Sequence, residues 1–193
     1  MGAVRSVRVV WGAGAVSAMM LFLSACGGDN QENAAAPGDF SVTLHRTVCF
    51  GPCPVYTASV DASGLVEYDG TRCVAVYGHQ ESRLSQERLR ALMAAFREID
   101  FFDLQDVYRS DEIACAPGLF DGTVIVTTLR VNGMEKTVRH WHGCNAEDVT
   151  ARLDAFERRV DDLLGTAQWV PCGIGPLDGY PDYSRCQGRP GCQ

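Results

Sequence analysis

Two cysteines four positions apart, Cys49 and Cys53, form the motif of this chain that could most readily do chemistry, within the run Cys-Phe-Gly-Pro-Cys-Pro. A thiol–disulfide catalyst uses a thiolate whose pKa is lowered, often at a helix N-terminus and in a Cys-x-x-Cys spacing. Here three residues separate the cysteines, and the alternating residues 55–60 that follow predict a strand. We therefore interpret the pair as a structural disulfide. Thiol–disulfide exchange and copper binding at this loop remain the alternative.

Two histidines, His140 and His142, are the next candidates, because residues two apart in a strand share one face. With Cys144 or His79 they could supply the nitrogen and sulfur ligands of a divalent ion. The hairpin predicted for this region, however, places both on its more apolar face, where a hydrogen-bonded, partly buried histidine is the usual finding. We predict no metal site and no cofactor, with His140 and His142 as the alternative ligands.

The remaining cysteines fit an exported, disulfide-stapled domain. The chain has nine cysteines, and setting Cys26 aside leaves an even number, which allows 105 pairings. Cys115 and Cys144 flank the predicted hairpin near its base, and Cys186 and Cys192 could close a small loop in the C-terminal tail. The disulfide candidates are Cys49, Cys53, Cys115, Cys144, Cys186 and Cys192.

The N-terminal residues are typical of a targeting signal for export. Arg5 and Arg8 precede an apolar run over residues 9–23, which is shorter than the roughly 20 residues that cross a bilayer. The following Leu-Ser-Ala-Cys resembles a bacterial lipoprotein signal ending at Cys26, which would carry the lipid. We expect an exported protein that is anchored to the membrane of the cell envelope through Cys26. Gly27 suits sorting to the outer membrane in a Gram-negative host.

The composition narrows the choice of partners. The formal net charge of −7 argues against nucleic acid and anionic lipid headgroups as main partners. The sequence lacks a G-x-S-x-G elbow, an H-E-x-x-H pair and a phosphate-binding glycine loop. We therefore predict a non-enzymatic binding or structural module, whose partner is an unidentified envelope protein or glycan. An inhibitor of envelope hydrolases is a weaker alternative.

These motifs must be positioned by an α+β fold. Asn132-Gly133 between two alternating runs predicts a two-residue hairpin, with Arg130 opposite Glu135 and Ile125 opposite His140. Apolar residues at helical spacing predict one helix from Ser85 to about residue 99 and another from Asn145 to Gly165. Four strands precede the first helix, at 41–47, 55–60, 65–68 and 73–77.

The resulting order ββββ-α-ββ-α predicts an antiparallel sheet with both helices packed on one face. We divide the chain into a signal peptide (1–25), a flexible tether (26–39), one α+β domain (40–165) and an irregular tail rich in cysteine, glycine and proline (166–193).

Several runs resemble a bacterial family called domain of unknown function number 6438. These runs are the Cys-Phe-Gly-x-Cys-Pro-x-Tyr loop at residues 49–56, Gly-Leu-Val-Glu-Tyr-Asp-Gly at 64–70, the helix end Phe-Arg-Glu-Ile-Asp-Phe-Phe-Asp-Leu at 96–104 and Val-Arg-His-Trp-His-Gly-Cys at 138–144. The resemblance covers roughly residues 41–165 and implies an exported or lipid-anchored envelope protein, with no activity to carry over. The tail beyond Gly165 departs from the family pattern.

Overall fold

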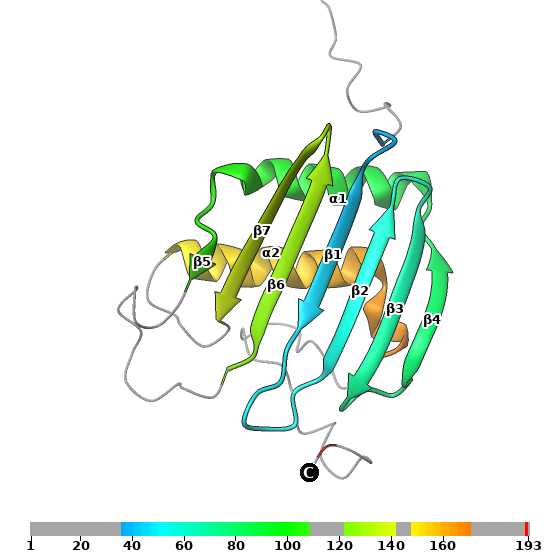
Figure 1. Cartoon of the computed structure of the whole chain (residues 1–193), viewed down its shortest axis with the longest axis vertical. Helices are drawn as coiled ribbons and strands as arrows, with labels where there is room; N and C mark the ends of the chain where they lie inside the picture. The colour runs from blue at the N-terminus through cyan, green and yellow to red at the C-terminus, as the bar shows by residue number, and fades with distance from the viewer. Residues whose placement is uncertain (1–35, 109–121, 142–147, 171–191, 193) are drawn as a thin grey trace, which may run out of the picture. The chain divides into compact units, whose positions relative to one another are not determined.

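A computed structural model describes residues 36–108, 122–141, 148–170 and 192. Within them, seven strands form one sheet in the order β4-β3-β2-β1-β6-β7-β5, and two helices cover one of its faces (Figure 1). All neighbouring strands are antiparallel except β5 and β7, which are parallel. The α+β prediction is therefore confirmed. In chain order the elements are β1 Ser41–Arg46, β2 Val55–Asp61, β3 Leu65–Arg72, β4 Gly78–Arg83, α1 Gln86–Glu98, the 3-10 turn η2 Phe101–Asp103, β5 Val107–Tyr108, β6 Val124–Val131, β7 Met134–Trp141, α2 Asp148–Leu164 and the 3-10 turn η3 Thr166–Gln168.

The core lies between the sheet and the two helices. Alternate residues of β1, β2 and β3 are buried, as expected for a sheet with one covered face. Phe96 of α1 meets Phe156 of α2 edge to face, with ring centroids 4.9 Å apart, and Phe101 packs edge to face against Phe96 at the same separation. Among the described helices, none is long and apolar enough to cross a membrane.

The helix ends follow the residues that predicted them. Ser85 caps α1, since its side chain accepts a hydrogen bond from the backbone N–H of Arg88 at 3.2 Å. Gly165 ends α2 with a φ of 76°, a left-handed conformation that glycine adopts without strain. Asn145, the predicted cap of α2, lies outside the described residues.

The predicted hairpin is confirmed in every pair that the structure describes. Arg130 lies opposite Glu135 and Ile125 opposite His140 in the β6–β7 register. Asn132 and Gly133 both have positive φ, as a type I′ turn requires. The carboxylate of Asp39 accepts hydrogen bonds from both of their backbone N–H groups, at 3.0 and 2.5 Å.

The predicted fourth strand at 73–77 is wrong. Cys73 has a φ of 52°, which ends β3, and the N–H groups of Ala75 and Val76 donate to the carbonyl of Trp169. The true fourth strand is β4, a polar edge strand without a buried residue, so its sequence lacks the apolar alternation that identifies strands. The two-residue β5 was likewise too short to predict.

Candidate functional site

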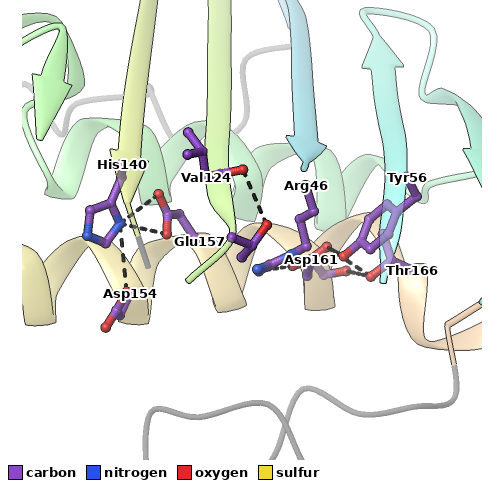
Figure 2. A network of polar contacts seen from close by, with 9 residues as sticks. Arg46, Tyr56, Val124, His140, Asp154, Glu157, Asp161 and Thr166 are labelled. Carbon is purple, nitrogen blue, oxygen red and sulfur yellow. Dashed lines mark hydrogen bonds and ion pairs between the residues drawn. The ribbon is translucent and has the colours of Figure 1, made fainter. Parts of the chain in front are cut away.

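A row of side chains crosses four neighbouring strands on the covered face of the sheet. The strand register places Tyr56 beside Arg46, Arg46 beside Ile125 and Ile125 beside His140. Helix α2 lies across this row and faces it with three acidic side chains at helical spacing (Figure 2). We call the following group the buried polar layer, since every member is less than 9% exposed: Arg46, Tyr56, His140, Asp154, Glu157, Asp161 and Thr166.

In the arginine half of this layer, the carboxylate of Asp161 accepts hydrogen bonds from three side chains. Arg46 donates from Nε at 2.8 Å and from Nη2 at 2.5 Å, both to Oδ2. Tyr56 donates to Oδ1 at 2.6 Å, and Thr166 donates to the same oxygen at 3.0 Å. One guanidinium therefore balances one fully buried carboxylate, with further hydrogen bonds completing its shell.

The pKa values of Arg46 and Tyr56 are both raised, so neither group changes its charge near neutral pH. Burial alone would lower the pKa of Arg46. The charge and hydrogen bond of Asp161, together with the charges of Tyr56 and Glu157, outweigh burial and raise that pKa above its ordinary value. Burial, and then the charge of Asp161, raise the pKa of Tyr56 well above its usual value. Arg46 therefore stays charged and Tyr56 stays a hydrogen-bond donor.

In the histidine half, one imidazole faces two carboxylates. Nδ1 of His140 lies 3.0 Å from Oε2 and 3.2 Å from Oε1 of Glu157, and 3.7 Å from Oδ1 of Asp154. Burial raises the pKa of Glu157 and of Asp154, since a carboxylate loses hydration in the interior. For His140, burial alone would lower the pKa, but the charge and hydrogen bond of Glu157, together with the charge of Asp154, outweigh burial and raise the pKa. Within the described residues, two buried carboxylates therefore lie around one imidazole.

The Cys49–Cys53 disulfide is confirmed, with Cα atoms 5.7 Å apart, and it closes the connection between β1 and β2. Cys53 is buried at 2% exposure, whereas Phe50 between the two cysteines is 89% exposed. The backbone N–H of Gly51 donates to Sγ of Cys49 at 3.1 Å. Because Arg46 precedes this loop and Tyr56 follows it, the buried polar layer holds the base of the loop while its tip faces solvent.

The other predicted disulfides fare differently. The structure pairs Cys192 with Cys73, so the predicted closure of Cys186 onto Cys192 is wrong. The partner is 119 positions away, at the left-handed residue that ends β3, and short spacing in the tail could not reveal it. Cys186 itself, with Cys26, Cys115, His142 and Cys144, lies outside the described residues.

The structure gives His140 other neighbours than the metal alternative supposed. Its prediction as a buried, hydrogen-bonded histidine is confirmed, but its described partners are Glu157 and Asp154 of α2. Sequence reasoning missed Arg46, Glu157 and Asp161. A signal was present, because Arg46 follows Val42 and Leu44 on the inward face of β1, and the acids of α2 adjoin its apolar stripe.

The buried polar layer contains one residue from each of two runs that carry the family resemblance. Tyr56 ends the cysteine loop run at 49–56, and His140 lies in the run at 138–144. The family model described as Domain of unknown function (DUF6438) matches residues 40–164, which is more than half of the chain. The chain belongs to the DUF6438 family. The matched DUF6438 domain contains all of the buried polar layer except Thr166, which follows the end of the match. A search of curated proteins finds no match.

Proposed function

We propose that this DUF6438 protein is a lipid-anchored, non-catalytic binding protein of the bacterial cell envelope, and that the loop at residues 47–54 contacts its partner. The observation that carries the proposal is Phe50, which is 89% exposed on a loop closed by the Cys49–Cys53 disulfide. Aromatic side chains, phenylalanine among them, are enriched at the cores of protein interfaces. A loop held in one conformation loses little entropy on binding.

The surroundings of Phe50 support an apolar protein partner. Val48, in the same loop, is 58% exposed. Tyr77, in the β3–β4 connection at the same end of the sheet, is 47% exposed (Figure 1). Neither 47–54 nor 73–77 contains a charged residue. An uncharged surface with three exposed apolar side chains suits an apolar pocket of another protein better than a charged ligand.

The anchor rests on the signal that ends at Cys26, and residues 26–39 would serve as the tether. Labelling of growing cells with radioactive palmitate tests this part. The full chain should incorporate the label, and Cys26→Ser should abolish incorporation and release the protein from the membrane fraction. Unchanged membrane association in Cys26→Ser would contradict lipid anchoring.

The binding role is tested by placing a photo-crosslinking amino acid at position 50 of the full chain in the bacterium that encodes it. Position 134 is the matched control, because Met134 is also an apolar residue, 52% exposed, but lies at the opposite end of the sheet. We expect one discrete protein adduct from position 50 and none from position 134. With that protein purified, Phe50→Ser should weaken binding about 30-fold, a loss typical of an anchor residue, while Met134→Ser should not.

Three results would contradict this role. Adducts that are the same from both positions indicate non-specific contact, and an adduct that a glycosidase removes indicates a glycan partner. Equal affinity of Phe50→Ser and the unaltered chain for the captured protein would also exclude Phe50 as the anchor.

The hydrogen bond from Gly51 to Cys49 Sγ favours a second candidate function, thiol–disulfide exchange at the same loop. Such a bond stabilises a thiolate and so lowers the pKa of the thiol after reduction. Equilibration with glutathione buffers, followed by alkylation and mass spectrometry, tests it. A pair that reduces at the potential of known thiol–disulfide catalysts supports exchange, or copper binding by the reduced thiols. A pair that stays oxidised below about −300 mV is structural.

A further inference from the structure

The geometry points to a binding site for one divalent transition-metal ion of the zinc type, formed by His140, Asp154 and Glu157 where β7 meets α2. This site is independent of the loop at 47–54 and of the partner proposed for it. Each residue offers one ligand atom, and these atoms all lie within 4.8 Å of one another. An imidazole nitrogen with carboxylate oxygens is a ligand set that zinc binds in proteins.

The spacing of the ligand atoms suits such an ion. Ligands that bind zinc at 2.0–2.2 Å in a tetrahedral arrangement lie roughly 3.4 Å from one another. Nδ1 of His140 is 3.0 Å from the nearer oxygen of Glu157 and 3.7 Å from Oδ1 of Asp154, so the observed separations fall on either side of this value. Small side-chain rotations would place all three around one ion.

The backbone fixes these ligands from two elements. Asp154 and Glu157 are three positions apart on α2 and therefore project from the same side of the helix. His140 projects from β7 in the row that α2 covers, as Figure 2 shows. A ligand set divided between a strand and a helix is brought together only when these two elements pack.

Charge and burial also favour a cation here. His140 is 0%, Glu157 1% and Asp154 7% exposed, and two buried carboxylates face one imidazole. The charge of Arg46 is engaged by Asp161. Among the described residues, Arg158 also lowers the pKa of Asp154, but its effect is smaller than the effect of burial. A divalent ion would neutralise both carboxylates directly.

The second group of candidate ligands provides a control. Glu67, His79 and Glu81 also come within ligand distance of one another, but all three are exposed on β3 and β4. Glu81→Gln therefore disables this surface cluster and leaves the buried site intact.

The test uses the full chain, purified in detergent, stripped with a chelator and titrated with zinc. We expect one zinc per chain, and a melting temperature raised by about 5–10 °C when free zinc is about 100 times its Kd. Glu157→Gln and Asp154→Asn each preserve shape and should weaken zinc binding by at least about 100-fold, since they remove a direct ligand. Glu81→Gln should bind zinc as the unaltered chain does.

The inference is overturned if the stripped chain binds no zinc, or if Glu157→Gln binds it with unchanged affinity. Should the variants in α2 fail to fold, X-ray absorption of the zinc-loaded Glu81→Gln protein decides the question. Nitrogen and oxygen neighbours alone support the site, whereas sulfur neighbours assign the ion to the cysteines and overturn it.

Discussion

The two halves of the buried polar layer bury acidic side chains from the same helix but handle their charge differently. In the arginine half, Asp161 is matched by Arg46, whose charge is permanent, and by two hydroxyl donors. In the histidine half, Glu157 and Asp154 share His140, whose charge depends on a proton. The buried charge of Asp161 is thus neutralised within the folded chain. The proposed metal ion would neutralise the charges of Glu157 and Asp154.

This difference indicates separate roles for the two halves. A permanent ion pair with every oxygen engaged fixes α2 against β1 and β2, and with them the base of the cysteine loop. In the histidine half, the ligand atoms of His140, Asp154 and Glu157 lie within 4.8 Å of one another, which suits the cation proposed above. Matched acid-to-amide substitutions in the two halves test whether their contributions to stability differ.

The largest effect is expected from Asp161→Asn in the arginine half. This change leaves the guanidinium of Arg46 buried without its hydrogen-bonded counter-charge, which should lower the free energy of unfolding by about 3–5 kcal/mol. Urea unfolding followed by circular dichroism measures it, with Asp162→Asn, an exposed neighbour on the same helix, as the control. A loss equal to that of the control would mean that the ion pair contributes nothing to stability.

A smaller effect is expected from Tyr56→Phe, which removes one hydroxyl donor to Asp161 but leaves Arg46 and Thr166 in place. Loss of a hydrogen bond to a charged group should cost about 1.5–3 kcal/mol. Tyr108→Phe is the matched control beside the histidine half, because within the described residues the hydroxyl of Tyr108 accepts a hydrogen bond from the Gln105 N–H and bonds no carboxylate. If both variants lose the same stability in urea, the charge of Asp161 does not strengthen the bond from Tyr56.

Glu157→Gln, measured in chelator, should cost at most about 1 kcal/mol, because the amide oxygen still accepts a hydrogen bond from His140 and one buried charge is removed. The contrast with Asp161→Asn is therefore the sharpest test of the comparison. Comparable losses from the two amide variants would show that Glu157 is as firmly balanced as Asp161.

The smallest effect is expected from Asp39→Asn at the exposed end of the β6–β7 hairpin. Hydrogen bonds from Gly133 and Asn132 lower the pKa of Asp39 from its ordinary value of 3.8. Because the folded pKa lies below the unfolded one, the carboxylate stabilises the fold above pH 3.8, and this contribution is lost as pH falls through the folded pKa. The stability difference from the unaltered chain should thus be present at pH 7 and vanish at low pH. A difference that persists under acid conditions would exclude the charge as its cause, and Asp103→Asn serves as the exposed control.

The parts of the fold that were predictable are those with local causes. The register of the β6–β7 hairpin follows from a two-residue turn, and the limits of α1 from Ser85 and an apolar stripe. Strand β4 escaped prediction because an edge strand of polar residues buries nothing. The Cys73–Cys192 bond escaped because its partners are 119 positions apart and composition alone allows many pairings.

The sequence by itself determined the α+β class, the two helices, the β6–β7 hairpin, the closed cysteine loop and the family to which the chain belongs. Only the tertiary structure decided that Arg46, His140 and Glu157 belong to one buried layer. The reason is that their burial requires β6 to pair with β1 and α2 to lie across both, over separations of about 80 to 115 residues along the chain. Residue type shows which side chains can carry charge, but tertiary packing decides which of them are buried together between the sheet and α2.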